Sequence, residues 1–522
     1  MRLIQLIQKS TELSSEGQEI PDIEIVGIES DSRKIKPGFI FVALEGGLSD
    51  GHNFINAAIA NGAAAIVGRK RFQSLRCPYF RVDNPRKELA HLAATLNGNP
   101  ARKLRIIGVT GTDGKTTTVT LIHQILTACG VKAGMISTVH AVFGDEQIDT
   151  GFHVTTPEAT TIQELLKKMV DRGFTHVVLE TTSHGLDQYR VEGCEFDIAV
   201  VTNITHEHFD YHRDYEGYFS AKFKLIEELV KTVEKPLGNP RLAIVNHDDI
   251  SFPFIYERLQ NESLSKINLL DYGLNNDSEI FADKIKVTPD GLSFNVSVKG
   301  KVFHVASPLA GSFNVHNILA AISATLVGLD LGEDSVLEGI KSMQGVPGRM
   351  EKIDLGQEFT AIVDFAHTPN ALKVALLTAR EMTTGRTIAV FGSAGLRDKE
   401  KRRMMAAVSI QNADITIMTA EDPRTESLAA ILAEMADEAV RKGGKLGRTF
   451  FTVEDRGEAI RKAVFLAQKG DLIIACGKGH EQSMCFGETE YLWDDIIAMR
   501  AAISEKMGVN GPQMPWLPTQ KK

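Results

Sequence analysis

The stretch 108-GVTGTDGKTTT-118 follows an apolar run, residues 104–109, and precedes a helical pattern, residues 116–129. It is therefore predicted to be a turn from a β-strand into an α-helix. Similar apolar runs alternate with helical patterns along most of the chain, which is typical of a mostly parallel sheet with helices on both faces. The runs are residues 104–109, 176–180, 196–203 and 241–246, followed by 359–365, 386–392, 413–419 and 471–477.

The composition of the turn indicates what it binds. Gly111 and Gly114 allow the backbone to bend around an oxyanion, and Lys115 adds a positive charge where the helix begins. The turn therefore predicts a phosphate-binding loop for ATP, with the hydroxyl of Thr116 or Thr117 on Mg²⁺. The alternative is a glycine-rich turn that carries a lysine by chance.

The length of the chain, 522 residues, predicts several domains, because one hydrophobic core does not serve a chain of this size. We expect an α/β protein of three domains: a small α/β domain at 1–98, a central parallel-sheet ATP-binding domain at 99–345, and a Rossmann-like α/β domain at 346–522. Residues 270–307 are predicted to form antiparallel strands around a Pro-Asp-Gly turn. The last residues, 510–522, are expected to be loosely ordered.

Composition narrows the classes of function. A net charge of -9, with dispersed Lys and Arg, argues against a nucleic-acid-binding surface. The five cysteines show no CxxC pair, which predicts neither a disulfide framework nor a structural zinc site and favours a reducing compartment. No apolar run is long enough for a membrane span. We therefore expect a cytoplasmic monomer with small-molecule partners and no membrane insertion.

Polar clusters follow nearly all of the strand-like runs. In open parallel sheets, ligands bind outside the carboxyl ends of the strands, because loops and helix N-termini converge there. The central and last domains are therefore each expected to carry a site at this edge of the sheet, and the two edges are expected to face each other.

Two motifs of the central domain offer metal ligands. Glu180 ends an apolar strand, where a carboxylate is costly unless it points into a site, so it is the first candidate ligand for Mg²⁺. His206, His208 and His212 follow another strand, and His208 is the best of them for a Mg²⁺ contact. A zinc site of the HExxH type fails because Asp210 replaces the second histidine. A capping or solvated-loop role for these histidines is the alternative.

Lys222 lies at the edge of a helical apolar stripe that includes Phe219, Phe223, Ile226 and Val230. A partly desolvated lysine has a lowered pKa, and its neutral amine reacts with CO₂ to give a carbamate. The alternative is a surface lysine whose stem covers apolar residues, and periodicity alone favours that alternative.

The last domain carries further basic and polar groups at its strand ends. Taken as structure alone, residues 393–403 begin a helix with a solvated charged face, and residues 420–426 form a turn with salt bridges. The shared position at strand ends favours a functional role for both. A catalytic triad is not supported, because Ser183 and His184 are adjacent and lack nucleophile-elbow glycines. The groups are Arg349, Asp364, His367, Arg397, Lys399, Arg424, Lys478, His480 and Glu481.

Together these motifs resemble, in order and nearly end to end, those of the Mur ligase family. The family's loop is Gly-x-x-Gly-Lys-Thr, which accounts for the spacing here, where Val109 stands five residues before Gly114 in place of the usual glycine. The branch that adds the third amino acid to UDP-N-acetylmuramoyl-L-alanyl-D-glutamate is the most similar. The matching segments are GTDGKTT, ETTSHGLDQYR, NITHEHFDYH, YFSAKF, NHDD, GSFNVHN, GVPGRME, DFAHTPNAL, GSAGLRDKEKR, DPRTE and GKGHE.

The resemblance implies an ATP-dependent amide ligase of peptidoglycan biosynthesis that joins a free diamino acid to the UDP-muramoyl dipeptide through an acyl phosphate. It implies an ATP site made of Gly111, Thr112, Asp113, Gly114, Lys115, Thr116, Thr117, Asn314, Arg349 and Asp364. Catalysis is assigned to Lys115, Glu180, His208 and Lys222, and Mg²⁺ binding to Thr116, Glu180, His208 and Lys222. In this role Lys222 is carbamylated (N6-carboxylysine), which reverses the preference from periodicity.

Two binding sets follow from the same resemblance. The UDP-muramoyl dipeptide is expected at Ser32, with its neighbours Asp31 and Arg33, at the turn 45–51, and at Thr155, Thr156, Thr182, Gln188 and Arg190. The incoming amino acid is expected at Arg397, Glu421, Asp422, Pro423, Arg424, Gly477 and Glu481.

One motif departs from the family pattern. Members that use meso-2,6-diaminopimelate show Asp-Asn-Pro-Arg where this chain has Glu421-Asp422-Pro423-Arg424. Arg424 is suited to clamp a distal carboxylate, which favours diaminopimelate. Asp422 replaces an amide with an acceptor-only anion, which favours a bare ammonium such as that of lysine or ornithine. A folylpolyglutamate-type ligase and a non-catalytic nucleotide switch are weaker alternatives.

Overall fold

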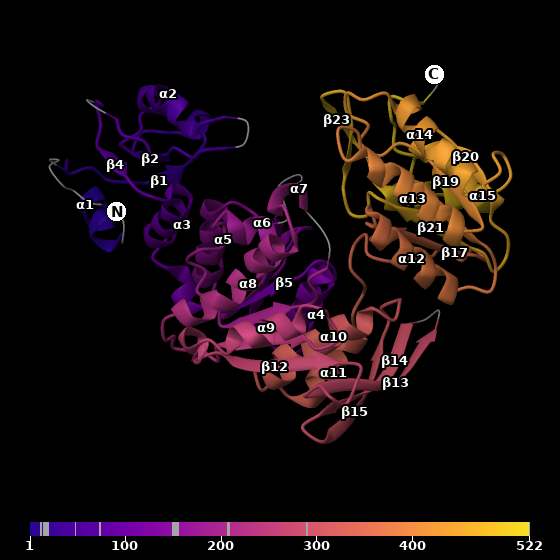
Figure 1. Ribbon diagram of the computed structural model, residues 1–522, viewed down its shortest axis with the longest axis horizontal. Coiled ribbons are helices and arrows are strands. Elements are labelled where there is room, and N and C mark those ends of the chain that lie inside the picture. The colour runs from indigo at the N-terminus through magenta and orange to yellow at the C-terminus, as the bar shows by residue number, and fades with distance from the viewer. Residues whose placement is uncertain are drawn as a thin grey trace. The chain divides into compact units, whose positions relative to one another are not determined.

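The computed structural model describes residues 1–10, 13, 20–46, 49–72, 75–148, 156–205, 209–288 and 291–520. The chain divides into two compact units, both drawn in Figure 1. The first unit consists of Met1–Asp283, Val296–Val302 and His316–Ile340, and the second of Lys284–Asn295, Phe303–Val315 and Lys341–Lys522.

The first unit begins with a small parallel sheet of order β1-β2-β3-β4. Helix α3 (Pro85–Leu96) follows the last strand and begins at a proline, where the side chain of Asn84 accepts a hydrogen bond from the backbone of Lys87. The other elements are β1 (Gly27–Glu29), β2 (Phe39–Val42), β3 (Ala65–Gly68), β4 (Tyr79–Arg81), α1 (Leu3–Lys9) and α2 (Ile55–Ala60).

The central sheet has the order β15-β14-β13-β12-β11-β10-β5-β9-β6-β7-β8. Strands β12 to β6 of this order are parallel. Strand β5 lies between β9 and β10, where the chain turns from one half of the sheet to the other, so the loop after β5 opens at a topological switch point. The strands are β5 (Arg105–Thr110), β6 (Ala133–Ile136), β7 (Ala141–Phe143), β8 (Glu146–Ile148), β9 (His176–Glu180), β10 (Ile198–Val201), β11 (Leu242–Asn246), β12 (Asn268–Gly273), β13 (Ile280–Thr288), β14 (Gly291–Val298) and β15 (Lys301–Ser307).

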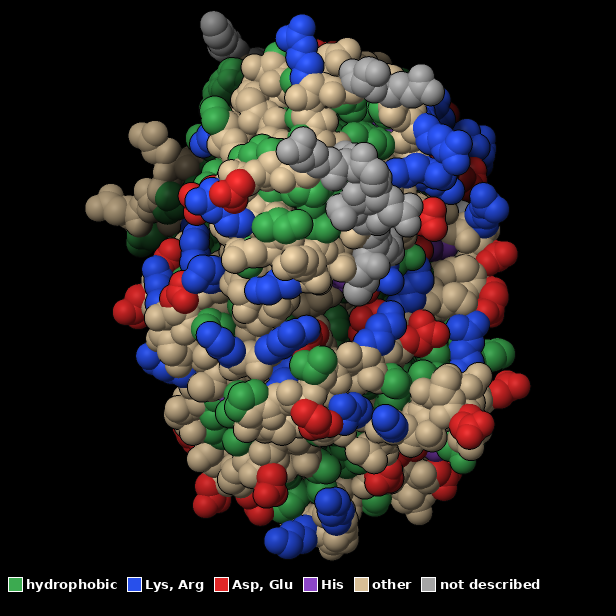
Figure 2. All heavy atoms as spheres, turned by 90° about the vertical axis from the view of Figure 1, so that its left-hand side faces the viewer, with side chains coloured by type: hydrophobic (Ala, Val, Ile, Leu, Met, Phe, Trp, Pro, Cys, Tyr) green, Lys and Arg blue, Asp and Glu red, His purple; other side chains and the backbone are tan. Residues whose placement is uncertain are grey.

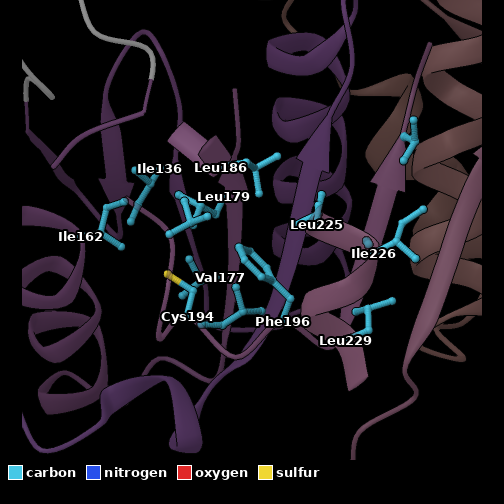
Figure 3. Packing of buried hydrophobic residues seen from close by; sticks show 14 of the residues in the cluster. Ile136, Ile162, Val177, Leu179, Leu186, Cys194, Phe196, Leu225, Ile226 and Leu229 are labelled. Carbon is cyan, nitrogen blue, oxygen red and sulfur yellow. The ribbon is translucent and has the colours of Figure 1, made fainter. Parts of the chain in front are cut away.

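The core of this region consists of aliphatic and aromatic side chains from the strands, the loops and the helices that cover the sheet. Figure 3 shows Val177 and Leu179 of β9 beside Phe196, with Leu225, Ile226 and Leu229 of α8. Strands covered on both faces read as continuous apolar runs, which is why these runs are recognisable in the sequence. The helices are α4 (Lys115–Ala128), α5 (Ala159–Asp171), α6 (Ser183–Asp187), α7 (Phe209–His212), α8 (Tyr215–Lys231), α9 (Phe252–Leu259), α10 (Asn314–Ile322) and α11 (Glu333–Lys341).

The second unit contains a sheet of order β16-β17-β21-β18-β19-β20. All of its pairs are parallel except the edge pair β16–β17. Strand β18 separates β21 from β19, so the loops after β21 and β19 leave strands that are not neighbours. The elements are β16 (Glu351–Ile353), β17 (Thr360–Asp364), β18 (Thr387–Phe391), β19 (Ile415–Met418), β20 (Phe450–Thr452), β21 (Leu472–Cys476), β22 (Ser483–Phe486), β23 (Thr489–Leu492), α12 (Pro369–Glu381), α13 (Lys399–Asn412), α14 (Leu428–Arg441), α15 (Arg456–Leu466) and α16 (Asp495–Met507).

The α/β class and all eight predicted parallel strands are confirmed, and two expectations are wrong. Strand β12, which overlaps the start of the segment expected to be antiparallel, pairs parallel with β11 and with β13 because it continues the central sheet. The tail is not loosely ordered along its described part: Leu517 is fully buried in the core of the second unit, and Trp516 lies 5.8 Å from the ring of Tyr491. The Pro289-Asp290 turn lies outside the described residues.

No helix within the described ranges combines the length and apolar character that crossing a bilayer requires. Acidic and basic side chains are intermixed over much of the face in Figure 2. This agrees with the dispersed charge that the sequence indicates.

Candidate active site

The loop after β5 is shaped by two glycines with left-handed backbone conformations. Gly111 has a φ of 155°, and a Cβ there would lie 1.8 Å from the hydroxyl of Thr202. Gly114 has a φ of 80°, and a Cβ there would lie 2.2 Å from the side-chain oxygen of Asn317. Asn203 accepts a hydrogen bond from the backbone of Asp113 at 2.9 Å, which holds the loop against the end of β10. No other residue type fits the two glycine positions without displacing these neighbours.

The first residues of α4 lie beside the end of β9, and the Thr116 side chain contacts Glu180 there. The Thr116 hydroxyl lies 3.1 Å from both carboxylate oxygens of Glu180, and the backbone of Thr138 donates to one of them at 3.0 Å. Glu180 is 1% exposed, as expected of a carboxylate that points into a site. Lys115 donates to the Thr112 carbonyl at 2.7 Å. Hydroxyl and carboxylate oxygens are the donors that Mg²⁺ prefers, so this set fits the predicted ion.

Lys222 extends from α8 to the underside of the phosphate loop. It is 1% exposed, so its interpretation as a surface lysine is wrong. Its ammonium donates to the Gly111 carbonyl at 2.6 Å and lies 4.6 Å from the centre of the Tyr218 ring. The Tyr218 hydroxyl in turn lies 3.1 Å from that of Thr112. Lys222 is thus in direct contact with the nucleotide loop, and its carbamylation stays a prediction.

The residues predicted to bind the muramoyl dipeptide form one hydrogen-bonded group beside Glu180. The hydroxyls of Thr156 and Thr182 lie 3.0 Å apart. The Arg190 guanidinium donates to the Thr156 carbonyl and to the Gln188 side chain, both at 2.9 Å. Thr156 also donates to the Glu180 carbonyl at 3.3 Å, which connects this group to a predicted metal ligand.

Some predicted residues are not brought to this group. Ser32 is buried at the start of a short 3₁₀-helix that follows β1. Its contact with the UDP end of the dipeptide substrate stays a prediction. Thr155 and His208 lie outside the described residues.

The second unit presents a buried carboxylate after β19. Glu421 is 6% exposed, and its Oε2 has no hydrogen-bond partner among the described residues. A Cβ on Gly477, after β21, would lie 2.4 Å from that oxygen, so the glycine leaves the carboxylate room. Burial raises the pKa of Glu421 more than the nearby Lys401, Arg456 and Lys478 lower it.

Asp422 is paired inside the protein. The Lys478 ammonium lies 3.1 Å from both of its carboxylate oxygens, and the Cys485 backbone donates to it at 2.9 Å. Lys478 is fully buried and also contacts Glu481 at 2.6 Å. Burial alone would lower the pKa of Lys478, but Glu481 and Asp422 raise it. Asp422 and Glu481, which are both predicted to bind the incoming amino acid, therefore share one buried cation.

The loops after β18 and β19 are joined to each other. The Gly395 backbone donates to the Asp422 carbonyl at 2.9 Å, and Leu396 donates to Glu426 at 2.9 Å. Asp422 and Arg424, on either side of Pro423, have positive φ angles of 38° and 54°, a strain that is common at functional sites. The Arg424 guanidinium makes no hydrogen bond or salt bridge with any described residue.

The last group of predicted residues also belongs to the second unit. Asp364, at the end of β17, accepts hydrogen bonds from the backbones of Met350 and Ala366 at 2.7 and 2.8 Å. The Arg349 guanidinium lies 4.5 Å from the centre of the Phe365 ring. Asn314 donates to the Ala310 carbonyl at 2.7 Å. Because the phosphate loop belongs to the first unit, the contact of these three residues with ATP stays a prediction.

Sequence reasoning missed several residues that shape the site. Asn203 lies two residues after the end of β10, and other site residues also lie just after a strand. Asn317 lies one helical turn after Asn314, and that spacing is a usable signal. Tyr218 had no such signal, because only the folded chain shows that it contacts Lys222. Lys478 was recognised as a polar group at a strand end, but only the folded chain shows that it pairs with Asp422.

A separate cluster in the N-terminal sheet brings Glu45, Asp50 and His52 together with metal-ligand spacing. His52 already uses both ring nitrogens, one with Asp50 at 2.6 Å and one as acceptor from the Arg69 backbone at 3.1 Å. The cluster therefore braces the turn 45–51 and carries no metal assignment.

Comparison with known proteins identifies the family. Three family models match: "Mur ligase family, catalytic domain" at 24–95, "Mur ligase middle domain" at 109–325 and "Mur ligase, glutamate ligase domain" at 348–479. The UDP-N-acetylmuramoyl-L-alanyl-D-glutamate--2,6-diaminopimelate ligase of Geobacillus kaustophilus is 39% identical over 92% of this chain and 96% of its own length. The chain belongs to the Mur ligase family. This Mur ligase is therefore a three-domain α/β enzyme that uses ATP to form an amide bond in cell-wall biosynthesis.

Three further proteins extend the comparison. The UDP-N-acetylmuramyl-tripeptide synthetase of Roseiflexus sp. is 39% identical over 94% of this Mur ligase and 96% of its own chain. A solved UDP-N-acetylmuramoyl-L-alanyl-D-glutamate--2,6-diaminopimelate ligase superposes with a TM-score of 0.68 at 29% identity, covering 97% and 99% of the two chains. The folylpolyglutamate synthase of Mycobacterium tuberculosis, at 17% identity and a TM-score of 0.61 over 81% and 94% of the chains, shares the fold. The exact domain boundaries at 98 and 345 stay predictions.

Proposed function

We propose that this Mur ligase adds meso-2,6-diaminopimelate to UDP-N-acetylmuramoyl-L-alanyl-D-glutamate with hydrolysis of ATP to ADP and phosphate. The name of the Geobacillus relative, which matches nearly the whole chain, supports the acceptor and the amino acid. The observation that carries the choice of amino acid is the internal pairing of Asp422 with Lys478.

Asp422 was the one residue whose chemistry favoured lysine or ornithine. Its carboxylate is paired with a fully buried ammonium and accepts a backbone hydrogen bond, so its oxygens are already engaged inside the protein and are less available to a second ammonium. Arg424 has no partner of its own among the described residues, and a guanidinium binds a carboxylate through two parallel hydrogen bonds. Diaminopimelate has a distal carboxylate for Arg424, whereas lysine and ornithine do not.

The first chemical step joins two anions. The terminal glutamyl carboxylate of the dipeptide attacks the γ-phosphorus of ATP, the bond to the β-phosphate oxygen breaks, and ADP leaves an acyl phosphate behind. Lys115 and the amides of the loop between Gly111 and Gly114 offset the repulsion, and Thr156, Thr182 and Arg190 orient the dipeptide beside Glu180. Catalysis of this kind rests on positioning and charge compensation.

In the second step, the amine of the incoming amino acid attacks the acyl carbon. A tetrahedral intermediate forms, phosphate leaves, and the amine loses a proton as the amide is made. Glu421, Arg424 and the loop at Gly477 hold the amino acid in this proposal. Mg²⁺ would be held by Thr116, Glu180, His208 and carbamylated Lys222, and it supplies positive charge to the phosphate oxygens.

The proposal is tested by measuring phosphate release with ATP and the UDP-muramoyl dipeptide while the amino acid is varied. We expect diaminopimelate to give a kcat/KM at least 100-fold above that of L-lysine or L-ornithine, and Arg424→Lys to reduce that ratio to less than tenfold. An equal or higher kcat/KM with lysine or ornithine would assign the enzyme to those substrates. Phosphate release that needs no UDP-muramoyl acceptor would contradict the proposed acceptor.

A further inference from the structure

Arg456, the first residue of α15, is a fully buried cation outside the predicted amino-acid pocket. Its guanidinium forms a two-point pair with Asp495, with Nε–Oδ1 at 2.7 Å and Nη2–Oδ2 at 2.6 Å. Asp495 is also fully buried and accepts a hydrogen bond from the Trp493 indole at 2.8 Å. Two buried charges are expensive to desolvate, so a pair of this kind is weak evidence for stability alone.

The remaining donors of Arg456 reach two backbone carbonyls of particular position. Nη1 donates to Ala420 at 3.2 Å, and Nη2 donates to Cys476 at 2.8 Å. Ala420 directly precedes Glu421, and Cys476 directly precedes Gly477. One planar group thus holds the last carbonyls before the two loops that carry the predicted amino-acid pocket.

The sheet joins these two loops only indirectly, through the strand that lies between theirs. They follow β19 and β21, and β18 lies between these strands, so no ladder hydrogen bond joins their ends. The spacing matters because the unpartnered oxygen of Glu421 occupies the space that a side chain on Gly477 would fill. A planar guanidinium held by a two-point ion pair is a rigid spacer for such a gap.

We propose that Arg456 and Asp495 are positioning residues for the amino-acid pocket, which hold the Glu421 loop and the Gly477 loop at the separation that the incoming amino acid requires. The inference rests on the proposed function, because it deepens the assignment of that pocket. It predicts that loosening the pair weakens binding of the amino acid and leaves the acyl-phosphate half of the reaction intact.

The test compares Arg456→Lys and Asp495→Asn with a matched control at the other end of β21. There Asp471 pairs with Arg386 at 2.6 Å, so Asp471→Asn also removes an ion pair from the same strand. KM is measured for diaminopimelate, ATP and the UDP-muramoyl dipeptide in each full-length variant, together with the thermal midpoint. Trp493→Phe serves as a milder variant, because it keeps both charges and removes one hydrogen bond from Asp495.

A second assay replaces the amino acid with hydroxylamine, which needs no amino-acid pocket. Its nitrogen attacks the acyl phosphate, phosphate leaves, and a stable hydroxamate of the dipeptide accumulates. In Arg456→Lys and Asp495→Asn we expect KM for diaminopimelate to rise at least tenfold, KM for ATP and the dipeptide to change less than threefold, and hydroxamate formation to stay within threefold of the wild-type rate.

The outcomes separate the two levels of the proposal. Trp493→Phe should raise KM for diaminopimelate two- to fivefold, and Asp471→Asn should leave it unchanged even where its thermal midpoint falls. If hydroxamate formation and amide formation fall in parallel, or if Asp471→Asn raises KM equally, the pair is structural and the inference is wrong. If the Arg456 and Asp495 variants do not fold, an unchanged KM in Trp493→Phe overturns it. No hydroxamate from the wild-type enzyme would instead contradict the proposed function.

Discussion

At the scale of single residues, the phosphate loop concentrates charge where two anions must meet. Lys115 supplies the positive charge of this loop, and its ammonium donates a hydrogen bond to the Thr112 carbonyl. Glu180 and Thr116 bring oxygen donors to the same point. Glu180 ends a buried strand, whereas Lys115 and Thr116 begin the helix after the loop, so these two elements fix where the three side chains lie.

Lys115→Ala is expected to keep the fold and to lower kcat at least 100-fold, because removing one preorganised charge raises the barrier by about 3–4 kcal/mol. Steady-state phosphate release measures the loss, and circular dichroism reports the fold. The control is Lys167→Ala on α5, which removes a half-exposed lysine of the same domain. A Lys115→Ala enzyme with the wild-type rate would refute the assignment of the loop.

Lys222→Ala is expected to lose activity and to regain part of it with millimolar acetate, because the small carboxylate replaces the predicted carbamate in the space that the buried side chain leaves. Lys115→Ala is the matched control. This substitution removes a cation and not an anion, so acetate should not restore the activity of the variant. Absence of rescue for Lys222→Ala, or equal rescue of both variants, would argue against the carbamate.

Glu421→Gln is expected to raise KM for the amino acid at least tenfold while it stabilises the second unit at neutral pH. Burial raises the folded-state pKa of Glu421 above its ordinary value of 4.5, so the folded state disfavours the charged form. This cost is absent below pH 4.5, grows as pH rises through the raised pKa and is complete above it. The gain in the urea midpoint should therefore vanish at low pH.

Glu458→Gln serves as the control for the urea measurements, because it neutralises a half-exposed carboxylate on α15. It should alter neither KM nor the pH dependence of the midpoint. If Glu421→Gln destabilised the protein at neutral pH, or if its gain were the same at pH 4 and pH 8, the cost of burying the charge would not be the cause.

At the scale of elements, the polar residues that follow the strands serve two purposes. Thr182 caps α6, Thr368 caps α12 and Asp398 caps α13, each by accepting a backbone hydrogen bond in the first turn. The same positions converge on the carboxyl edge of a parallel sheet. A sequence pattern of apolar run, polar cluster and helix therefore predicts both the element boundaries and the edge where ligands bind.

The C-terminal tail is a structural element of the second unit. Leu517→Ala should destabilise this unit by about 2–5 kcal/mol, because the side chain is fully buried in its core. Urea unfolding measures the change, and the exposed Gln513→Ala is the control. A midpoint equal to that of the control would mean that the tail is not docked in solution.

Element predictions failed where pairing depends on distant segments. The alternation of residues 270–307 predicts strands, but it does not say that β12 pairs parallel with β11. Strands β7 and β8 and the hairpin of β22 and β23 are short and were not recognised. Their stability comes from neighbours in the sheet, which periodicity does not report.

At the scale of the whole molecule, the division into two compact units has a thermodynamic consequence. Units with separate cores are expected to unfold in two transitions, and a nucleotide held mainly by the phosphate loop should raise the transition of the first unit most. At 100 times its Kd, ADP with Mg²⁺ should stabilise the unit by about 2.7 kcal/mol.

Differential scanning calorimetry of the full chain checks this expectation. In Lys115→Ala, the ADP-dependent shift should be much reduced while both transitions persist. A single transition that ADP shifts as a whole would show that the units unfold cooperatively.

The sequence by itself determined the α/β class, the eight parallel strands, the phosphate loop and the edge at which the site residues lie, because period, glycine placement and strand ends are local properties. Only the tertiary structure decided that Lys222 is buried against Gly111, that Asp422 is paired with Lys478, and that Arg456 bridges the ends of β19 and β21. These facts depend on which side chains meet across the fold. Burial and pairing set the charge that a residue presents, and neither can be read from its neighbours in the chain.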